Sequence, residues 1–254
     1  MPEKIIKISV ILPCYNEGDG LVELIAAYRA VWPSFPSELI LVDNGSTDNS
    51  ASILALELAK PENEFTRTVR VEKNQGYGHG ILTGLRAARG EFLAWSHADL
   101  QCAPEDVFVA FEKIMRMPDP RKSLIKGKRG RRSFGEEIVT GGMSLFTIST
   151  LWFWLTDINA QPKMFHRSMM NLLPYPPDGF PWDLYVLYQA KRAKWQIASI
   201  PVTFGIRKYG RSKWAFGFIS RWRTILRMVR YILVLRLCPT GIPPKPNGDH
   251  SKWN

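Results

Sequence analysis

Three short motifs place acidic and amide side chains directly after segments that have the pattern of buried strands. They are Pro13-Cys-Tyr-Asn-Glu17, Val42-Asp-Asn-Gly-Ser-Thr-Asp48 and Ala98-Asp-Leu-Gln101. Because the carboxyl ends of parallel strands meet at one edge of a sheet, we expect the three motifs to form one site. Carboxylate and amide oxygens suit a hard divalent cation, which can neutralise the charge of phosphate groups.

The first half of the chain alternates between strand and helix patterns around these motifs. Nearly continuous apolar runs predict strands at 5–12, 39–42, 68–72 and 91–96. Helical spacing predicts helices at 17–32, 49–60 and 78–89, and a fourth that begins at Pro104. Ser46 or Thr47 could cap the second of these helices. This order predicts an α/β fold in which a mostly parallel central sheet carries helices on both faces.

The second half has a less regular pattern. A strand is expected at 122–126, a helix at 182–193, a strand at 195–204 and a long amphipathic helix at 214–237. Residues 138–156 are uncharged over nearly the length of a membrane span, but Gly141, Gly142 and several hydroxyl side chains favour a buried helix. The polar, proline-rich residues 239–254 are expected to be disordered.

The net charge of +11 arises mainly from the C-terminal third of the chain. No Asp or Glu occurs from Leu184 to Gly248, which implies an anionic partner: nucleic acid, phospholipid or a phosphorylated ligand. We expect no nucleic acid partner, because no RRM, KH or helix-turn-helix signature is present and the strand-end motifs would stay unexplained. The N-terminal residues do not have the pattern of a secretory signal, and three scattered cysteines fit a reduced, cytoplasmic compartment.

Taken together, the strand-end motifs resemble those of the family 2 glycosyltransferases, which have the GT-A fold. Further segments are similar to the dolichyl- and polyprenyl-phosphate sugar transferase branch: Asn159-Ala-Gln-Pro-Lys-Met-Phe165, Phe180-Pro-Trp-Asp183 and Arg207-Lys-Tyr-Gly-Arg-Ser-Lys213. The resemblance implies a catalytic domain over residues 1–213. It also implies an inverting, metal-dependent transfer of a sugar from a nucleotide-diphosphate sugar to a polyprenyl or dolichyl phosphate.

The resemblance assigns donor binding to residues at the strand ends. They are Pro13, Tyr15, Glu17, Asp43, Asn44, Gly76, Ala98 and Asp99. Asn44 stands where the family usually has a second acid. Gly76 lies in the glycine-rich turn 74–80, whose backbone N–H groups could approach the donor phosphates, although a purely structural turn is the alternative.

The expected cation site departs from the family pattern, because the family's Asp-x-Asp reads His97-Ala98-Asp99 here. The resemblance makes Asp99 and Gln101 ligands of Mn²⁺ or Mg²⁺. His97 is a further candidate, since imidazole is acceptable to Mn²⁺ but poor for Mg²⁺. Alternatively, His97 only forms a hydrogen bond with a neighbour. The substitution also leaves open a family member without activity that serves as a binding or scaffold subunit.

The expected acceptor site is basic. The resemblance places Arg129 and Arg207 at an acceptor phosphate, joined by Arg131, Arg132, Ser212 and Lys213, and a solvated basic loop is the alternative for the run at 128–133. A phosphate monoester is already an anion near neutral pH and needs no general base, whereas a hydroxyl does.

Asp183 stands where hydroxyl-directed members of the family keep their base. It could instead orient Arg207 or serve as an acid at the start of a helix. We therefore place Asp99, Arg129, Asp183 and Arg207 among the catalytic candidates. The alternative function is transfer to a hydroxyl acceptor in cell-surface polysaccharide synthesis.

The amphipathic helix at 214–238 combines a basic stripe with bulky apolar residues. Arg223, Arg227 and Arg230 share one helical face, and the arginines recur too often for a membrane span. We expect this helix to lie in the plane of an anionic leaflet, which would place the protein on the cytoplasmic face of a membrane. The alternatives are packing against the catalytic domain or pairing with a partner subunit.

Overall fold

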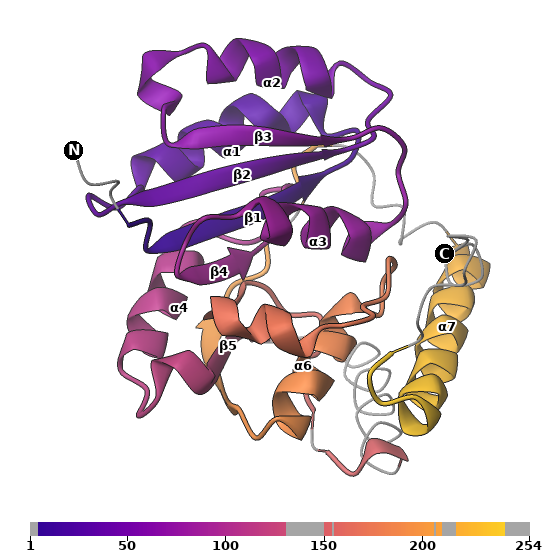
Figure 1. The fold of residues 1–254 in the computed structure, drawn as a ribbon. Coiled ribbons are helices and arrows are strands. Elements are labelled where there is room, and N and C mark those ends of the chain that lie inside the picture. Colours follow the sequence, from indigo (N-terminus) through magenta and orange to yellow (C-terminus); the bar gives the residue numbers. More distant parts are fainter. Residues whose placement is uncertain (1–4, 131–149, 154, 206, 210–216, 242–254) are drawn as a thin grey trace.

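The computed structural model describes residues 5–130, 150–153, 155–205, 207–209 and 217–241 of the chain. These residues contain a seven-stranded sheet in the order β3-β2-β1-β4-β6-β5-β7 (Figure 1). The strands are β1 Ile8–Cys14, β2 Ser37–Asn44, β3 Thr66–Val71, β4 Phe92–Trp95, β5 Ser123–Arg129, β6 Lys163–His166 and β7 Gln196–Val202. All neighbouring strands are parallel except β6, which runs antiparallel to β4 and β5.

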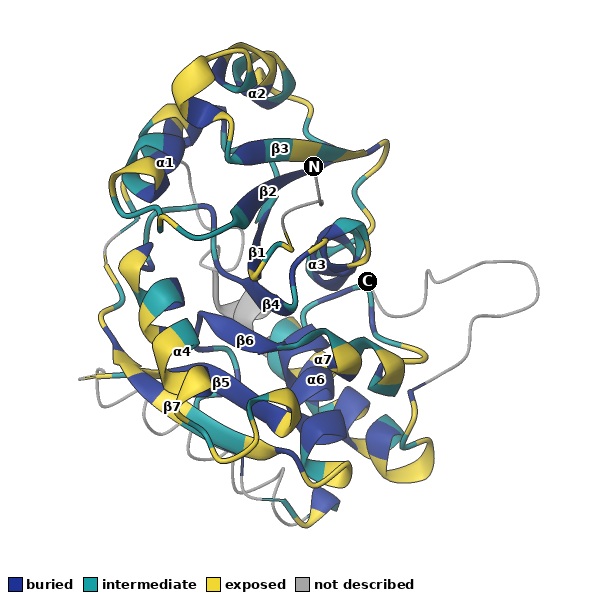
Figure 2. Cartoon of the chain, turned by 60° about the vertical axis from the view of Figure 1, so that its left-hand side comes forward, coloured by how far each residue is buried: buried dark blue, intermediate teal, exposed yellow. Residues whose placement is uncertain are grey.

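Helices cover both faces of this sheet (Figure 2). They are α1 Gly18–Ala30, α2 Ser50–Leu58, α3 Tyr77–Ala87, α4 Glu105–Met115, α6 Trp182–Arg192 and α7 Gly217–Leu237. Alternate side chains of β1 show which helices share a face: Val10 and Leu12 pack in a cluster with α1 and α4, whereas Ile11 packs in a cluster with α3, α6 and α7. The predicted α/β fold is confirmed, and the predicted boundaries lie within a few residues of those observed.

Some elements differ from the sequence prediction. β6 was not predicted, because the run Lys163-Met-Phe-His166 is short and polar at both ends. Neither predicted cap forms at α2; Asp48 lies there instead, and its carboxylate accepts a hydrogen bond of 3.0 Å from the Ser50 N–H. Most of the predicted helix at 138–156 lies outside the described residues. Among the described helices, none is long and apolar enough to cross a membrane.

The C-terminal helix is part of the same body as the sheet. Met228, Tyr231, Ile232 and Leu235 of α7 are buried in the cluster that contains α3 and α6. The chain stays attached after this helix, since the Tyr185 hydroxyl donates a hydrogen bond of 2.8 Å to the Thr240 carbonyl. Of the alternatives for this helix, packing against the catalytic domain is therefore observed. The structure also continues past residue 238, up to residue 241.

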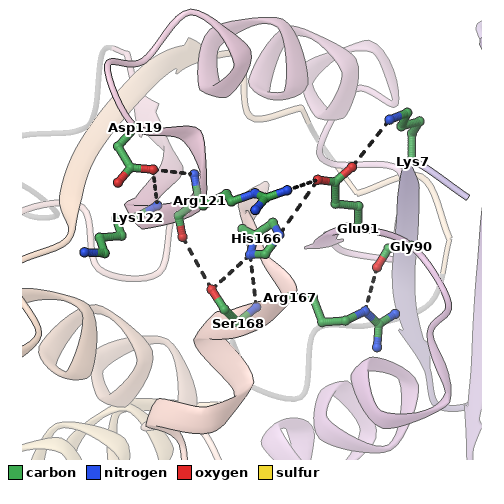
Figure 3. A network of polar contacts seen from close by, with 9 residues as sticks. All are labelled: Lys7, Gly90, Glu91, Asp119, Arg121, Lys122, His166, Arg167 and Ser168. Atoms are coloured by element: carbon green, nitrogen blue, oxygen red, sulfur yellow. Dashed lines mark hydrogen bonds and ion pairs between the residues drawn. The ribbon is translucent and has the colours of Figure 1, made fainter. Parts of the chain in front are cut away.

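A polar network holds the amino edge of the sheet together (Figure 3). Glu91, just before β4, faces the Lys7 ammonium at 3.5 Å, the Arg121 guanidinium at 3.7 Å and the His166 ring at 3.9 Å. The Arg167 side chain donates a hydrogen bond of 2.9 Å to the Gly90 carbonyl. These contacts connect the segments next to β1, β4 and β6 at the amino edge. The site lies at the opposite edge, where the parallel strands end.

Candidate active site

A cavity of about 290 Å³ opens at the carboxyl ends of β1, β2 and β4. Its lining comes from all three strand-end motifs, the turn after β3 and the segment after β7. The lining residues are Pro13, Cys14, Tyr15, Asn16, Glu17, Asn44, Asn74, Tyr77, His97, Ala98, Asp99 and Arg207. The structure thus brings together most of the predicted donor-binding residues with two metal candidates and one acceptor candidate.

Hydrogen bonds between the first two motifs shape one wall of the cavity. Asn16 has a left-handed backbone (φ 54°), its N–H donates to the Ser46 hydroxyl at 3.1 Å, and its side-chain oxygen accepts from the Thr47 N–H at 2.8 Å. Asp43 accepts from the Ser46 N–H at 2.9 Å and does not line the cavity. Asp43, a predicted donor-binding residue, therefore fixes the turn that the wall depends on.

Two asparagines in the cavity are oriented by the backbone of one residue, Gly76. The Asn44 amide donates to the Gly76 carbonyl at 2.9 Å, and the Gly76 N–H donates to the Asn74 side-chain oxygen at 2.9 Å. The Gly76 φ of 122° lies in a region that favours glycine. Because its N–H is engaged with Asn74, Gly76 orients these amides in this structure instead of pointing its N–H at a ligand.

The Asn44 side-chain oxygen has no hydrogen-bond partner among the described residues, although the side chain is only 3% exposed. Its orientation is fixed, because the amide nitrogen is used by Gly76 and is tightly flanked by Gly80, where an added Cβ would lie 2.8 Å away. A buried acceptor without a donor is costly. The oxygen is therefore suited to receive an N–H or O–H from a ligand in the cavity.

Arg207 links two carboxylates across the cavity. Its guanidinium is paired with Glu17 and lies 3.5 Å from Asp99. Burial raises the pKa of Glu17, and the contact with Arg207 opposes that shift. The segment that carries Arg207 is held on α1, where Glu23 binds both Lys208 and the Tyr209 hydroxyl, the latter at 2.9 Å.

The loop after β4 presents Asp99 to the cavity. Asp99 accepts a hydrogen bond of 3.2 Å from the Gln101 N–H, and the Gln101 side-chain amide donates to the Gly205 carbonyl at 3.1 Å. Within the described ranges, no three His, Cys, Asp or Glu side chains gather as a complete cation site. A carboxylate and an amide oxygen fit a hard cation whose remaining ligands come from phosphate oxygens and water.

His97 lies among aromatic rings. The Tyr77 ring is 6.1 Å away at an interplanar angle of 28°, and the Phe204 ring is 6.2 Å away at 81°. Burial lowers the pKa of His97, which keeps the imidazole neutral near pH 7. A neutral imidazole is compatible with either alternative for His97, ligation or hydrogen bonding, and the observed contacts are ring packing.

Asp183 lies beneath the cavity and is closed off from it. It is 2% exposed and does not line the cavity, and one of its oxygens accepts from Lys163 at 2.5 Å, Gln161 at 3.0 Å and Trp95 at 3.3 Å. The antiparallel register of β6 places Lys163 opposite Trp95, next to the end of β4. Among the described residues Asp183 forms no contact with Arg207, so the alternative in which Asp183 orients Arg207 is not observed.

Arg129 lies one layer behind the cavity, at the end of β5. Its guanidinium stacks on the Phe204 ring at 3.9 Å from the ring centre and donates to the Asn159 carbonyl at 3.4 Å. The same Phe204 ring contacts His97, which connects Arg129 to the cavity wall. The other predicted acceptor residues, Arg131, Arg132, Ser212 and Lys213, lie outside the described residues.

Sequence reasoning missed several residues of the site, although signals for them existed. Asn74 and Tyr77 lie in the glycine-rich turn, of which only Gly76 was singled out. Gln161 links the Tyr77 hydroxyl to Asp183, with 3.0 Å to each. A lysine next to Met164 and Phe165 in an apolar run is a signal for a buried cation that needs a carboxylate.

Comparison with known proteins agrees with this geometry. Residues 9–155 match Glycosyl transferase family 2. The chain belongs to this family. Its described fold is the α/β arrangement of the GT-A glycosyltransferases, and both predictions, the family and the class of enzyme, are confirmed.

Solved structures share this fold at low sequence identity. One is the glucosyl-3-phosphoglycerate synthase of Mycobacterium tuberculosis with Mn²⁺, UDP and glucosyl-3-phosphoglycerate, at 19% identity and a TM-score of 0.67 over 94% of this chain and 82% of that chain. Another is a mannosyltransferase from Pyrobaculum calidifontis with GDP-Man and Mn²⁺, at 20% identity and a TM-score of 0.65 over 95% and 67%. Neither is described as acting on a polyprenyl phosphate, so that branch stays a prediction.

Proposed function

We propose that this glycosyltransferase moves a sugar from a nucleotide-diphosphate sugar to the phosphate of a polyprenyl-phosphate lipid, with Mn²⁺ or Mg²⁺ as cofactor. The observation that carries the choice of acceptor is the position of Asp183. By resemblance, Asp183 occupies the motif position at which hydroxyl-directed members of the family keep their base, yet it is buried in an ion pair with Lys163. An acceptor that is already an anion requires no such base.

The donor side of the proposal rests on the cavity wall. The orphaned Asn44 oxygen can accept a hydrogen bond from a nucleobase N–H, and the neighbouring Asn74 amide adds a second polar group. Solved relatives of this fold hold UDP or GDP-Man together with Mn²⁺. Asp99 and Gln101 would hold the cation, which supplies charge neutralisation for the diphosphate leaving group.

The acceptor side rests on arginine chemistry. Arg207 lines the cavity, so it could bind the non-reacting oxygens of a phosphate, and Arg129, stacked on Phe204, adds a second positive charge behind the cavity wall. In the reaction one phosphate oxygen forms a bond to the anomeric carbon of the sugar. The bond from that carbon to the diphosphate oxygen breaks, and the nucleoside diphosphate leaves with the electron pair. No proton has to move in this step.

A donor and acceptor screen tests the proposal. The purified full chain is incubated with UDP- and GDP-sugars and Mn²⁺, together with either a short-chain polyprenyl phosphate or the matching polyprenol. We expect a lipid-linked sugar from the phosphate and none from the alcohol. Transfer to the alcohol or to a polysaccharide hydroxyl, with the phosphate unused, would favour the hydroxyl-directed alternative. Donor binding without any transfer would favour the binding or scaffold subunit.

A further inference from the structure

The helix α7 has two unlike sides. Its inner side is buried against α6, and the Tyr188 hydroxyl of α6 donates to the Leu235 carbonyl at 3.3 Å. Its other side, which we call the outer face of α7, carries exposed arginines and leucines at helical spacing. This face is formed by Arg223, Leu226, Arg227, Leu233, Arg236 and Leu237.

The leucines of this face are unusually open to solvent for large apolar side chains. Leu226 is 61% exposed, Leu233 48% and Leu237 82%. Exposed apolar residues scattered singly are normal, but leucines that alternate with arginines along one face mark an interaction surface. Figures 1 and 2 show α7 in the lower half of the molecule, away from α1 and α2 at the top.

An exposed tryptophan lies near the same helix. Trp152 is 76% exposed, and the adjacent Phe153 packs edge-on against Tyr188 at 5.8 Å. Since Tyr188 also binds the backbone of α7 at Leu235, Trp152 lies near the C-terminal half of this helix. An exposed indole beside a basic and apolar helix is a combination that suits the boundary between lipid headgroups and acyl chains.

The charge of the outer face is not balanced locally. No acidic residue occurs from Leu184 to Gly248, and Arg223, Arg227 and Arg236 form no ion pair with any described residue. An acidic protein groove would complement the charge but would not explain the leucines spaced along a convex helix. An anionic bilayer accommodates both, because headgroups meet the arginines while the leucines and the indole enter the boundary region.

We propose that the outer face of α7, together with Trp152, is a docking surface for an anionic lipid bilayer, with α7 lying in the membrane plane. The inner side of the helix keeps its contacts with α6, so docking needs no unfolding of the catalytic domain. The inference rests on α7 and Trp152 and is independent of the cavity and of which acceptor the enzyme uses.

Co-sedimentation of the full chain with vesicles tests the surface. We compare vesicles of phosphatidylcholine with vesicles that also contain phosphatidylglycerol, at low and high salt. Binding should require phosphatidylglycerol and fall with salt. Arg223→Gln/Arg227→Gln should weaken it roughly 30-fold, because each arginine near such a surface contributes about 1 kcal/mol, or about fivefold. The matched control is Arg86→Gln/Arg116→Gln, on α3 and directly after α4, which should bind as the parent does.

Apolar variants test the depth of contact. Leu226→Ala/Leu233→Ala should weaken binding several-fold, whereas Leu56→Ala/Val22→Ala, at 68% and 48% exposure on α2 and α1, should have no effect. Equal binding to both kinds of vesicle, or equal losses in outer-face and control variants, would overturn the proposal. So would a dimer in mass photometry that the leucine variants dissolve, because a second copy would then cover this face. Turnover with the short-chain acceptor reports separately on the proposed function.

Discussion

The sharpest prediction concerns Asp183→Asn, because it separates a structural carboxylate from a catalytic base. Lys163, Gln161 and Trp95 all donate to the same Asp183 oxygen, and an asparagine can present a carbonyl oxygen there. What the substitution removes is the negative charge beside a lysine that is fully buried. Removing one partner of a buried pair costs about 3–5 kcal/mol, out of a total unfolding free energy of about 5–15 kcal/mol.

We therefore expect Asp183→Asn to lose about 3–5 kcal/mol in urea unfolding. Turnover per folded molecule should stay within a few-fold of the parent at a temperature where the variant is folded. Calorimetric titration with the donor measures the concentration of folded sites, and turnover is divided by that concentration. Removing both charges, in Lys163→Met/Asp183→Leu, should cost less than Asp183→Asn alone, because no buried ion is left without a partner.

A matched control lies at the amino end of β2, away from this ion pair. Glu38 is a buried carboxylate that binds Arg67 at 2.7 Å and does not line the cavity. Glu38→Gln should also lose stability and keep full turnover per folded molecule. The reasoning is refuted if Asp183→Asn unfolds like the parent but loses a hundredfold or more in turnover, which is the scale of general-base catalysis.

Three further outcomes follow from the cavity. Asp99→Ala should abolish transfer, EDTA should stop the parent enzyme, and Mn²⁺ should support turnover at least as well as Mg²⁺; full activity in EDTA would exclude this cation site. Arg129→Ala and Arg207→Ala should each cost about 1.5–3 kcal/mol in acceptor use, measured as kcat/KM for the acceptor, while donor binding changes much less. Equal losses for donor and acceptor would contradict that assignment. Burial raises the pKa of Glu17 in the folded state, so the charged carboxylate destabilises the fold at any pH above both the folded and the unfolded pKa values. This destabilisation decreases as pH falls through the raised pKa of the folded state. Glu17→Gln should therefore be more stable than the parent at neutral pH and equal to it well below pH 4.5, as chemical unfolding at both pH values would show.

The part of the site that lies along β1, β2 and β4 could be predicted from the sequence. Continuous apolar runs such as that of β1 fix the strands, and the polar residues that follow must then meet at one edge. The parallel order β3-β2-β1-β4 brings these polar residues together, because each strand ends beside its neighbour. Pro13, Glu17, Asn44 and Asp99 therefore reach the same cavity as predicted.

The remainder depends on contacts that sequence spacing does not encode. Arg207 reaches Glu17 over 190 residues of chain, and only the packing of the segment after β7 against α1 brings them together. The burial of Asp183 depends on β6, whose four residues are too few to show a period. In both cases the side-chain types suggested ionic chemistry, but the partner was set by tertiary structure.

The backbone of Gly76 has a further consequence, because it makes Asn44 and Asn74 energetically dependent on each other. One asparagine is bound to its carbonyl and the other to its N–H, so a change in the backbone angles of this one residue would disturb both hydrogen bonds. Contributions of residues that share a partner do not add. In a double-mutant cycle on donor binding, the loss for Asn44→Ala/Asn74→Ala should be smaller than the sum of the two single losses. Strictly additive losses would mean that each amide keeps its orientation without the other.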